Sequence, residues 1–228
     1  LAMVDFVWNA WHFAAQHAGV LRIYSKKVGG GNLWLERWGV RVFVAYTALR
    51  AAGWTTGWIE ADAAGLSLLR ATDLMLILLP VALVGTNLVG LRRCQLGKVA
   101  YLTSFCSLYG GFLLSLTMNW GSLVGVFAAA GSMFHAVEYL AIVTHYALRR
   151  RKTGGEASFL FLARNWVLFL GLYLIMLGSV GVWASRPEGG VLVAWQGLNL
   201  WAAFVHYAYD GMIWKLRRPE TAAALGAG

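Results

Sequence analysis

Charged residues are scarce in this chain. Only 13% of its 228 residues are Asp, Glu, Lys or Arg, whereas 59% are hydrophobic, and the mean hydropathy is +0.61. A soluble globular domain usually carries about 25% charged residues. The scarcity therefore argues against an ordinary soluble domain and favours an integral membrane protein.

Cysteine is also rare. The two cysteines, Cys94 and Cys106, form no Cys-x-x-Cys motif, so we expect neither a disulfide framework nor a thiolate metal site. The His-Glu-x-x-His motif, the histidine boxes of membrane desaturases, internal repeats and low-complexity tracts are absent as well. The sequence therefore offers no established short motif from which a function can be assigned.

Apolar stretches of about 20 residues recur along the whole sequence. Each is long enough to cross a hydrocarbon core of roughly 30 Å. No separate soluble domain or long linker divides them, so we expect a single all-α transmembrane domain over residues 1–228, a polytopic helix bundle of about seven helices. The expected spans are 2–24, 38–59, 68–91, 98–118, 121–148, 159–184 and 190–214.

The loops between these spans alternate in charge. Basic clusters follow the first, third, fifth and seventh spans, and the other loops are acidic or neutral. By the positive-inside rule, the N-terminus is expected outside and the C-terminus in the cytoplasm, and we expect a bacterial inner (plasma) membrane. This topology, with attraction to anionic lipid headgroups, accounts for the net charge of +9, so no nucleic-acid partner is expected.

Three spans carry a histidine at a comparable distance from their basic ends. His12, His135 and His206 precede the first basic residue by 10, 14 and 9 positions, or roughly 13–21 Å of helix. If the three spans run parallel, the imidazoles form one layer near the middle of the bilayer. Ionisable side chains are costly there, so their presence points to function.

Each of these histidines belongs to a polar stripe on one helical face. Because polar stripes are costly against lipid, we expect them to face one another inside the bundle. The first-span stripe is Asp5, Asn9, His12 and Gln16; the fifth-span stripe is His135, Glu138 and His145; and the seventh-span stripe is Gln196, Asn199, His206 and Asp210.

The residue types in these stripes point to a metal ion. Glu138 follows His135 by three positions and Asp210 follows His206 by four, so each pair shares a helical face. Imidazole and carboxylate together suit a transition metal, and we expect iron. The predicted ligands are His12, His135, His206, Glu138 and Asp210, of which the two carboxylates are also the predicted catalytic groups. Gln16, Asn9 and Asn199 are the predicted supporting partners of the imidazoles.

The function expected from this pattern is a metal-dependent oxidoreductase that acts on a lipid-soluble small molecule. The alternative is a non-catalytic subunit that binds haem b, pigment or quinone beside other membrane subunits. A third interpretation is purely structural, since intramembrane histidines also join helices by hydrogen bonds. The last span has no lysine for a retinal Schiff base. The sequence also lacks the repeated halves that are typical of transporters.

Some polar residues are expected to lie outside the metal site. His17 is turned away from His12 on the helical wheel, and His145, close to Arg149, is expected to be interfacial and solvated. Arg50 is expected to pair with an acidic residue, Asp73 or Glu60, or to extend to the outer surface, and its role is expected to be structural.

Overall fold

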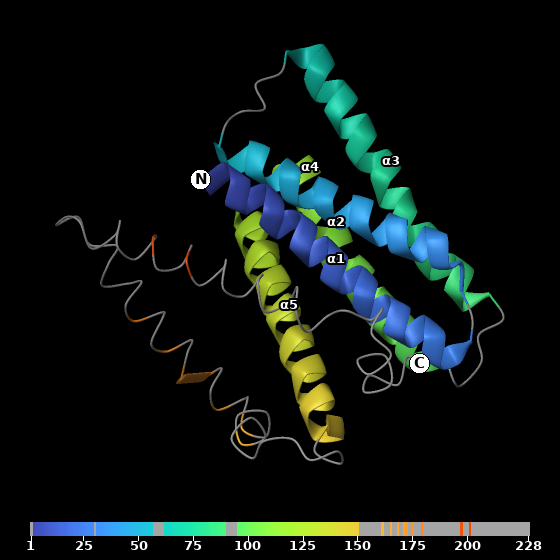
Figure 1. Ribbon diagram of the computed structural model, residues 1–228. Coiled ribbons are helices and arrows are strands. Elements are labelled where there is room, and N and C mark those ends of the chain that lie inside the picture. The colour runs from blue at the N-terminus through green and yellow to red at the C-terminus, as the bar shows by residue number, and fades with distance from the viewer. Residues whose placement is uncertain are drawn as a thin grey trace. The chain divides into compact units, whose positions relative to one another are not determined.

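The computed structural model describes residues 2–29, 31–56, 62–89 and 95–150, with isolated residues between 161 and 201. The described chain is helical (Figure 1), and its elements are α1 (Ala2–Val28), α2 (Leu33–Thr56), α3 (Ala63–Leu88), α4 (Leu96–Thr117) and α5 (Gly121–Arg150). Met3–Val137 form one compact unit and Glu138–Gly228 belong to another. The packing described below is that of the first unit.

The all-helical prediction is confirmed for these residues, and the five helices correspond to the first five expected spans. Among the described helices, α3, α4 and Gly121–His145 of α5 are long and apolar enough to cross a membrane. The other two carry more charge: α2, for example, contains Glu36, Arg37, Arg41 and Arg50. The expected spans 159–184 and 190–214 lie outside the described residues, apart from single positions.

Local signals mark several helix ends. The side chain of Asn32 accepts a hydrogen bond from the backbone N–H of Leu35 at 3.0 Å, and that of Asp62 accepts from Gly65 at 2.8 Å. These are N-cap interactions, which satisfy backbone donors that a helix start leaves unpaired. Asn119 has a φ of 57° in the turn between α4 and α5. Asparagine tolerates this left-handed conformation better than most residues.

The apolar core joins the first four helices. Two of the three α1 residues in this core are alanines. The largest fully buried core residues are Phe43 and Phe105. The buried cluster comprises Ala14, Ala18 and Leu21 of α1, Val40, Phe43 and Val44 of α2, Leu83 of α3, and Leu102, Phe105, Cys106, Tyr109 and Leu113 of α4.

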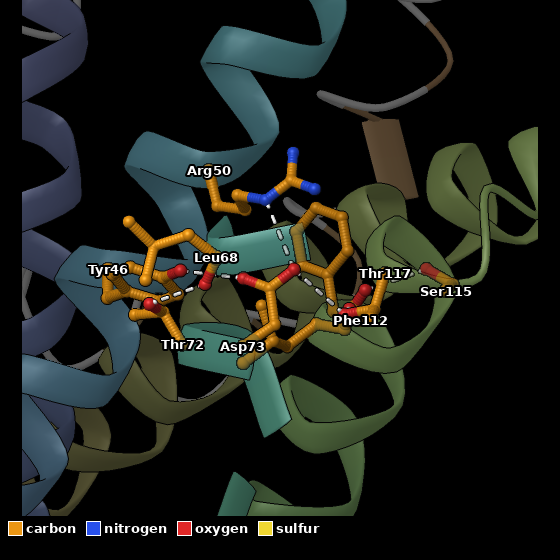
Figure 2. Close-up of polar contacts among 9 residues, drawn as sticks. Tyr46, Arg50, Leu68, Thr72, Asp73, Phe112, Ser115 and Thr117 are labelled. Atoms are coloured by element: carbon orange, nitrogen blue, oxygen red, sulfur yellow. Dashed lines mark hydrogen bonds and ion pairs between the residues drawn. The ribbon is translucent and has the colours of Figure 1, made fainter. Parts of the chain in front are cut away.

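A polar cluster centred on the fully buried Asp73 ties α2, α3 and α4 together (Figure 2). Tyr46 donates its hydroxyl to Oδ1 at 2.6 Å, while Arg50 Nε and the Thr117 hydroxyl donate to Oδ2 at 3.2 and 3.0 Å. Each carboxylate oxygen is therefore satisfied, as an ionised group in an apolar bundle requires. Arg50 thus pairs with Asp73, which was one of the two acidic partners expected for it.

A second polar cluster lies at the other end of α2. Lys98 Nζ of α4 contacts Glu36 Oε1, and the hydroxyl of Ser25 on α1 donates to Glu36 Oε2. All three side chains are buried. Gly31, with a φ of 112°, lies so close that a Cβ there would overlap Glu36 and Lys98. The two clusters are separated by roughly 15–21 Å along α2, and they hold the helices in register.

Removing the Asp73 carboxylate tests the first cluster. We expect Asp73→Ala to lower the free energy of unfolding by about 3–5 kcal/mol, because Arg50 is left buried without its counter-charge. The double variant Asp73→Leu/Arg50→Met removes both charges, and its free energy of unfolding should fall much less. Unfolding in mixed micelles with rising dodecyl sulfate measures the stability of both variants. Asp62→Ala, which removes only an exposed cap, is the control and should lower the free energy of unfolding by about 1 kcal/mol. Equal losses for Asp73→Ala and the double variant would contradict the assignment.

Candidate functional site

The structure brings two of the predicted ligands together. The rings of His12 on α1 and His135 on α5 lie edge to face, with their centroids 5.3 Å apart and an interplanar angle of 77°. His135 is buried, at 6% exposure, and His12 is half-buried. We call these two residues the histidine pair. Residues 123 positions apart in the sequence thus present two imidazoles at one place.

Two side chains of α1 hold His135 in position. The Gln16 amide donates from Nε2 to the backbone carbonyl of His135 at 3.0 Å. The Phe13 ring stacks on the His135 ring, with 3.8 Å between centroids and 13° between planes. Gln16 was expected to support an imidazole, and this hydrogen bond goes to the backbone of the histidine residue. The stacking covers one face of the His135 ring.

His17 is fully buried on another side of α1. Its Nε2 is 2.9 Å from the hydroxyl of Tyr109, and its Nδ1 is 3.4 Å from the hydroxyl of Tyr101, both on α4. Its ring centroid lies 6.2 Å from that of His135. Both nitrogens of this imidazole are therefore within reach of tyrosine hydroxyls, and His17 acts as the link between α1 and α4.

The predicted supporting and carboxylate residues are only partly described. Glu138 is buried on α5, one helical turn after His135. Asn9 is half-buried on α1 and makes no hydrogen bond to a described residue, so its predicted contact with an imidazole is not formed within this part of the chain. His206, Asp210 and Asn199 lie outside the described residues. Within the described part of the chain, no three His, Cys, Asp or Glu side chains cluster closely enough to hold a metal ion.

The sequence interpretation missed the part that His17 plays. A helical wheel compares directions around one helix, and it shows correctly that His17 and His12 point different ways. It does not show that a second helix packs against the other side. A signal was present in α4, where Tyr101, Phe105 and Tyr109 recur every four residues and so form one aromatic face.

Comparison of the chain with protein-family models, with curated proteins and with solved structures gave no match.

Replacing Tyr109 by phenylalanine tests the bond to His17. We expect Tyr109→Phe to lower the free energy of unfolding by about 1–3 kcal/mol, because a buried imidazole nitrogen loses a hydrogen-bonding partner while the ring packing is kept. Tyr24→Phe is the matched control, since Tyr24 stacks on Tyr101 with its ring, 5.4 Å between centroids. Its effect should stay within about 0.5 kcal/mol. A Tyr109→Phe variant as stable as Tyr24→Phe would show that the hydroxyl contributes nothing.

Proposed function

We propose that this chain is an integral membrane oxidoreductase that binds a transition-metal ion, iron, at the histidine pair and acts on a lipid-soluble substrate. The observation that carries the proposal is the 5.3 Å separation of the His12 and His135 rings. A histidine inside a membrane is costly, and a single interhelical hydrogen bond contributes only about 0.6 kcal/mol, so two adjacent imidazoles favour a ligand held between them.

The separation fits two ligands of one ion. A metal–nitrogen bond of about 2.0–2.2 Å places an ion about 3.2 Å from the centre of the ring that binds it, so two such rings have centres at most about 6.4 Å apart. Rings separated by 5.3 Å then subtend an angle of about 110° at the ion. That angle is close to the one between two ligands of a tetrahedral site.

The same distance makes haem the less favoured cofactor for this pair. Two axial imidazoles lie on opposite faces of a haem iron, so their ring centres approach the upper limit of about 6.4 Å with a flat macrocycle between them. The edge-to-face contact of His12 with His135 leaves no room for that macrocycle. A haem, pigment or quinone subunit remains the alternative outcome of the experiment below.

The remaining ligands of the proposal come from the polar stripes. Glu138, one turn after His135 on the same helix, is assigned as a carboxylate ligand or proton acceptor, and Asp210 is assigned the same role beside His206. Two imidazoles and one carboxylate with open positions form the ligand set of non-haem iron oxygenases. An ion so held would supply one-electron redox chemistry, while Phe13 stacks on the His135 ring and Gln16 bonds the backbone of that residue.

The proposal includes the membrane arrangement expected from the sequence. The bundle has about seven spans, with the N-terminus outside and the C-terminus inside, in a bacterial inner membrane. Three described helices are apolar enough to contact the bilayer, and the alternating charge of the loops supports the orientation. The histidine pair then lies on α1 and α5, two helices that run in the same direction across the membrane.

Metal content and the optical spectrum of the full chain, purified in detergent, test the proposal. We expect about one iron per chain, and His12→Ala or His135→Ala should lower the occupancy by about 10-fold or more, by analogy with the 10–100-fold loss caused by removing a supporting residue. His145→Ala is the control and should keep the metal.

Three results would contradict the proposal: a metal-free wild-type protein, equal occupancy in all three variants, or a Soret band that identifies haem. Circular dichroism and gel filtration of each variant separate loss of metal from loss of fold.

A further inference from the structure

A partly open cavity of about 260 Å³ lies between α1, α2, α4 and α5, and Phe13, which stacks on His135, is part of its wall. Its wall contains four aromatic side chains, and most of the rest is alanine. The aromatic residues are Phe6, Phe13, Tyr109 and Phe112. The small alanine side chains do not fill the space between the helices, and the aromatic rings line that space with flat apolar surfaces.

The wall of this cavity is also the support of the histidines. Phe13 lines the cavity and stacks on His135 at 3.8 Å. Tyr109 lines it as well and bonds His17 at 2.9 Å. Whatever occupies the cavity is therefore one aromatic ring away from His135.

Two polar side chains interrupt the apolar wall, Asn9 and Ser132. The Ser132 hydroxyl donates to the backbone carbonyl of Ala128 in its own helix at 3.2 Å. Asn9 is half-buried and makes no hydrogen bond to any residue that the structure describes. By contrast, Asn87 on α3 donates its amide to the Leu83 carbonyl at 2.8 Å. A primary amide in an apolar wall offers both a donor and an acceptor to a ligand.

We propose that this cavity binds the ring of the substrate, a planar one- or two-ring aromatic or quinone-type group whose oxygen bonds Asn9. The inference deepens the proposed function and rests on it, because the bound ring is a substrate only if the protein is the proposed oxidoreductase. An apolar cavity of about 150 Å³ holds benzene, so 260 Å³ suits a substituted single ring or a fused pair. Small-molecule sites are typically lined by apolar and aromatic groups with a few placed polar atoms, as this wall is.

A straight acyl chain fits the wall less well. Such a chain has no oxygen to engage the Asn9 amide along its length, and it gains nothing specific from aromatic faces. A ring uses both features, since it stacks on aromatic side chains in offset or edge-to-face arrangements. The proposal therefore distinguishes a ring with an oxygen from a hydrocarbon of similar size.

Filling the cavity tests the proposal, with 1,4-naphthoquinone as the probe. Gly131 lines the cavity, and a Cβ there would lie 3.8 Å from the Tyr109 hydroxyl, at ordinary contact distance. We expect Gly131→Leu to weaken binding of the probe about 10-fold or more in equilibrium dialysis of the detergent-solubilised full chain. Gly125→Leu is the matched control on the same helix, because a Cβ at Gly125 meets nothing within 4 Å, and its binding should equal that of wild type.

A second variant probes the polar contact and does not depend on Gly131→Leu folding. Asn9→Leu should weaken 1,4-naphthoquinone about 5-fold or more and leave naphthalene unchanged, whereas Asn87→Leu should change neither. Three results would overturn the proposal. The first is equal binding by Gly131→Leu and Gly125→Leu, and the second is an equal effect of Asn9→Leu on the two probes. The third is that decane displaces 1,4-naphthoquinone as well as naphthalene does.

Iron analysis of the same samples separates this inference from the proposed function. Iron-loaded protein that does not bind the ring contradicts the cavity assignment alone. A ring-binding protein without iron contradicts the oxidoreductase alone.

Discussion

Helix α1 places its two histidines in different contacts with α4 and α5, and the rest of the site depends on that packing. On one side His12 lies against His135 of α5, and on the other His17 bonds the tyrosines of α4. An apolar environment gives unpaired polar groups no compensating partner. The packing of α1 therefore makes His17 a hydrogen-bonded link to α4 and brings His12 beside the imidazole of His135.

The two buried polar clusters keep this arrangement in register. Asp73 joins α2, α3 and α4 near one end of α2, and Glu36 joins α1, α2 and α4 near the other. Sliding one of the first four helices by one turn, about 5.4 Å, would break contacts of at least one cluster. That constraint holds Tyr109 of α4 level with His17 of α1.

Hydropathy and helical spacing predicted the five described helices, and the polar stripe of α1 predicted that His12 and Gln16 face the helix that carries His135. Periodicity is sufficient there because both contacts lie on one face of one helix. Periodicity could not choose the partner of Arg50 from two acidic residues, because that choice depends on how α2 packs on α3. It also could not find the role of His17, nor the cavity, because these arise where three or four helices meet. The predicted contributions of His206 and Asp210 stay predictions, since both residues lie outside the described part of the chain.

The most direct test of the account is the X-ray absorption spectrum of iron bound to the full-length chain. If His12 and His135 share the ion, the spectrum will show at least two imidazole ligands at about 2.0–2.2 Å, and either His→Ala variant will lose one of them. A spectrum without imidazole scattering, or one that is the same in His12→Ala, His135→Ala and wild type, would contradict the claim that the histidine pair is a metal site.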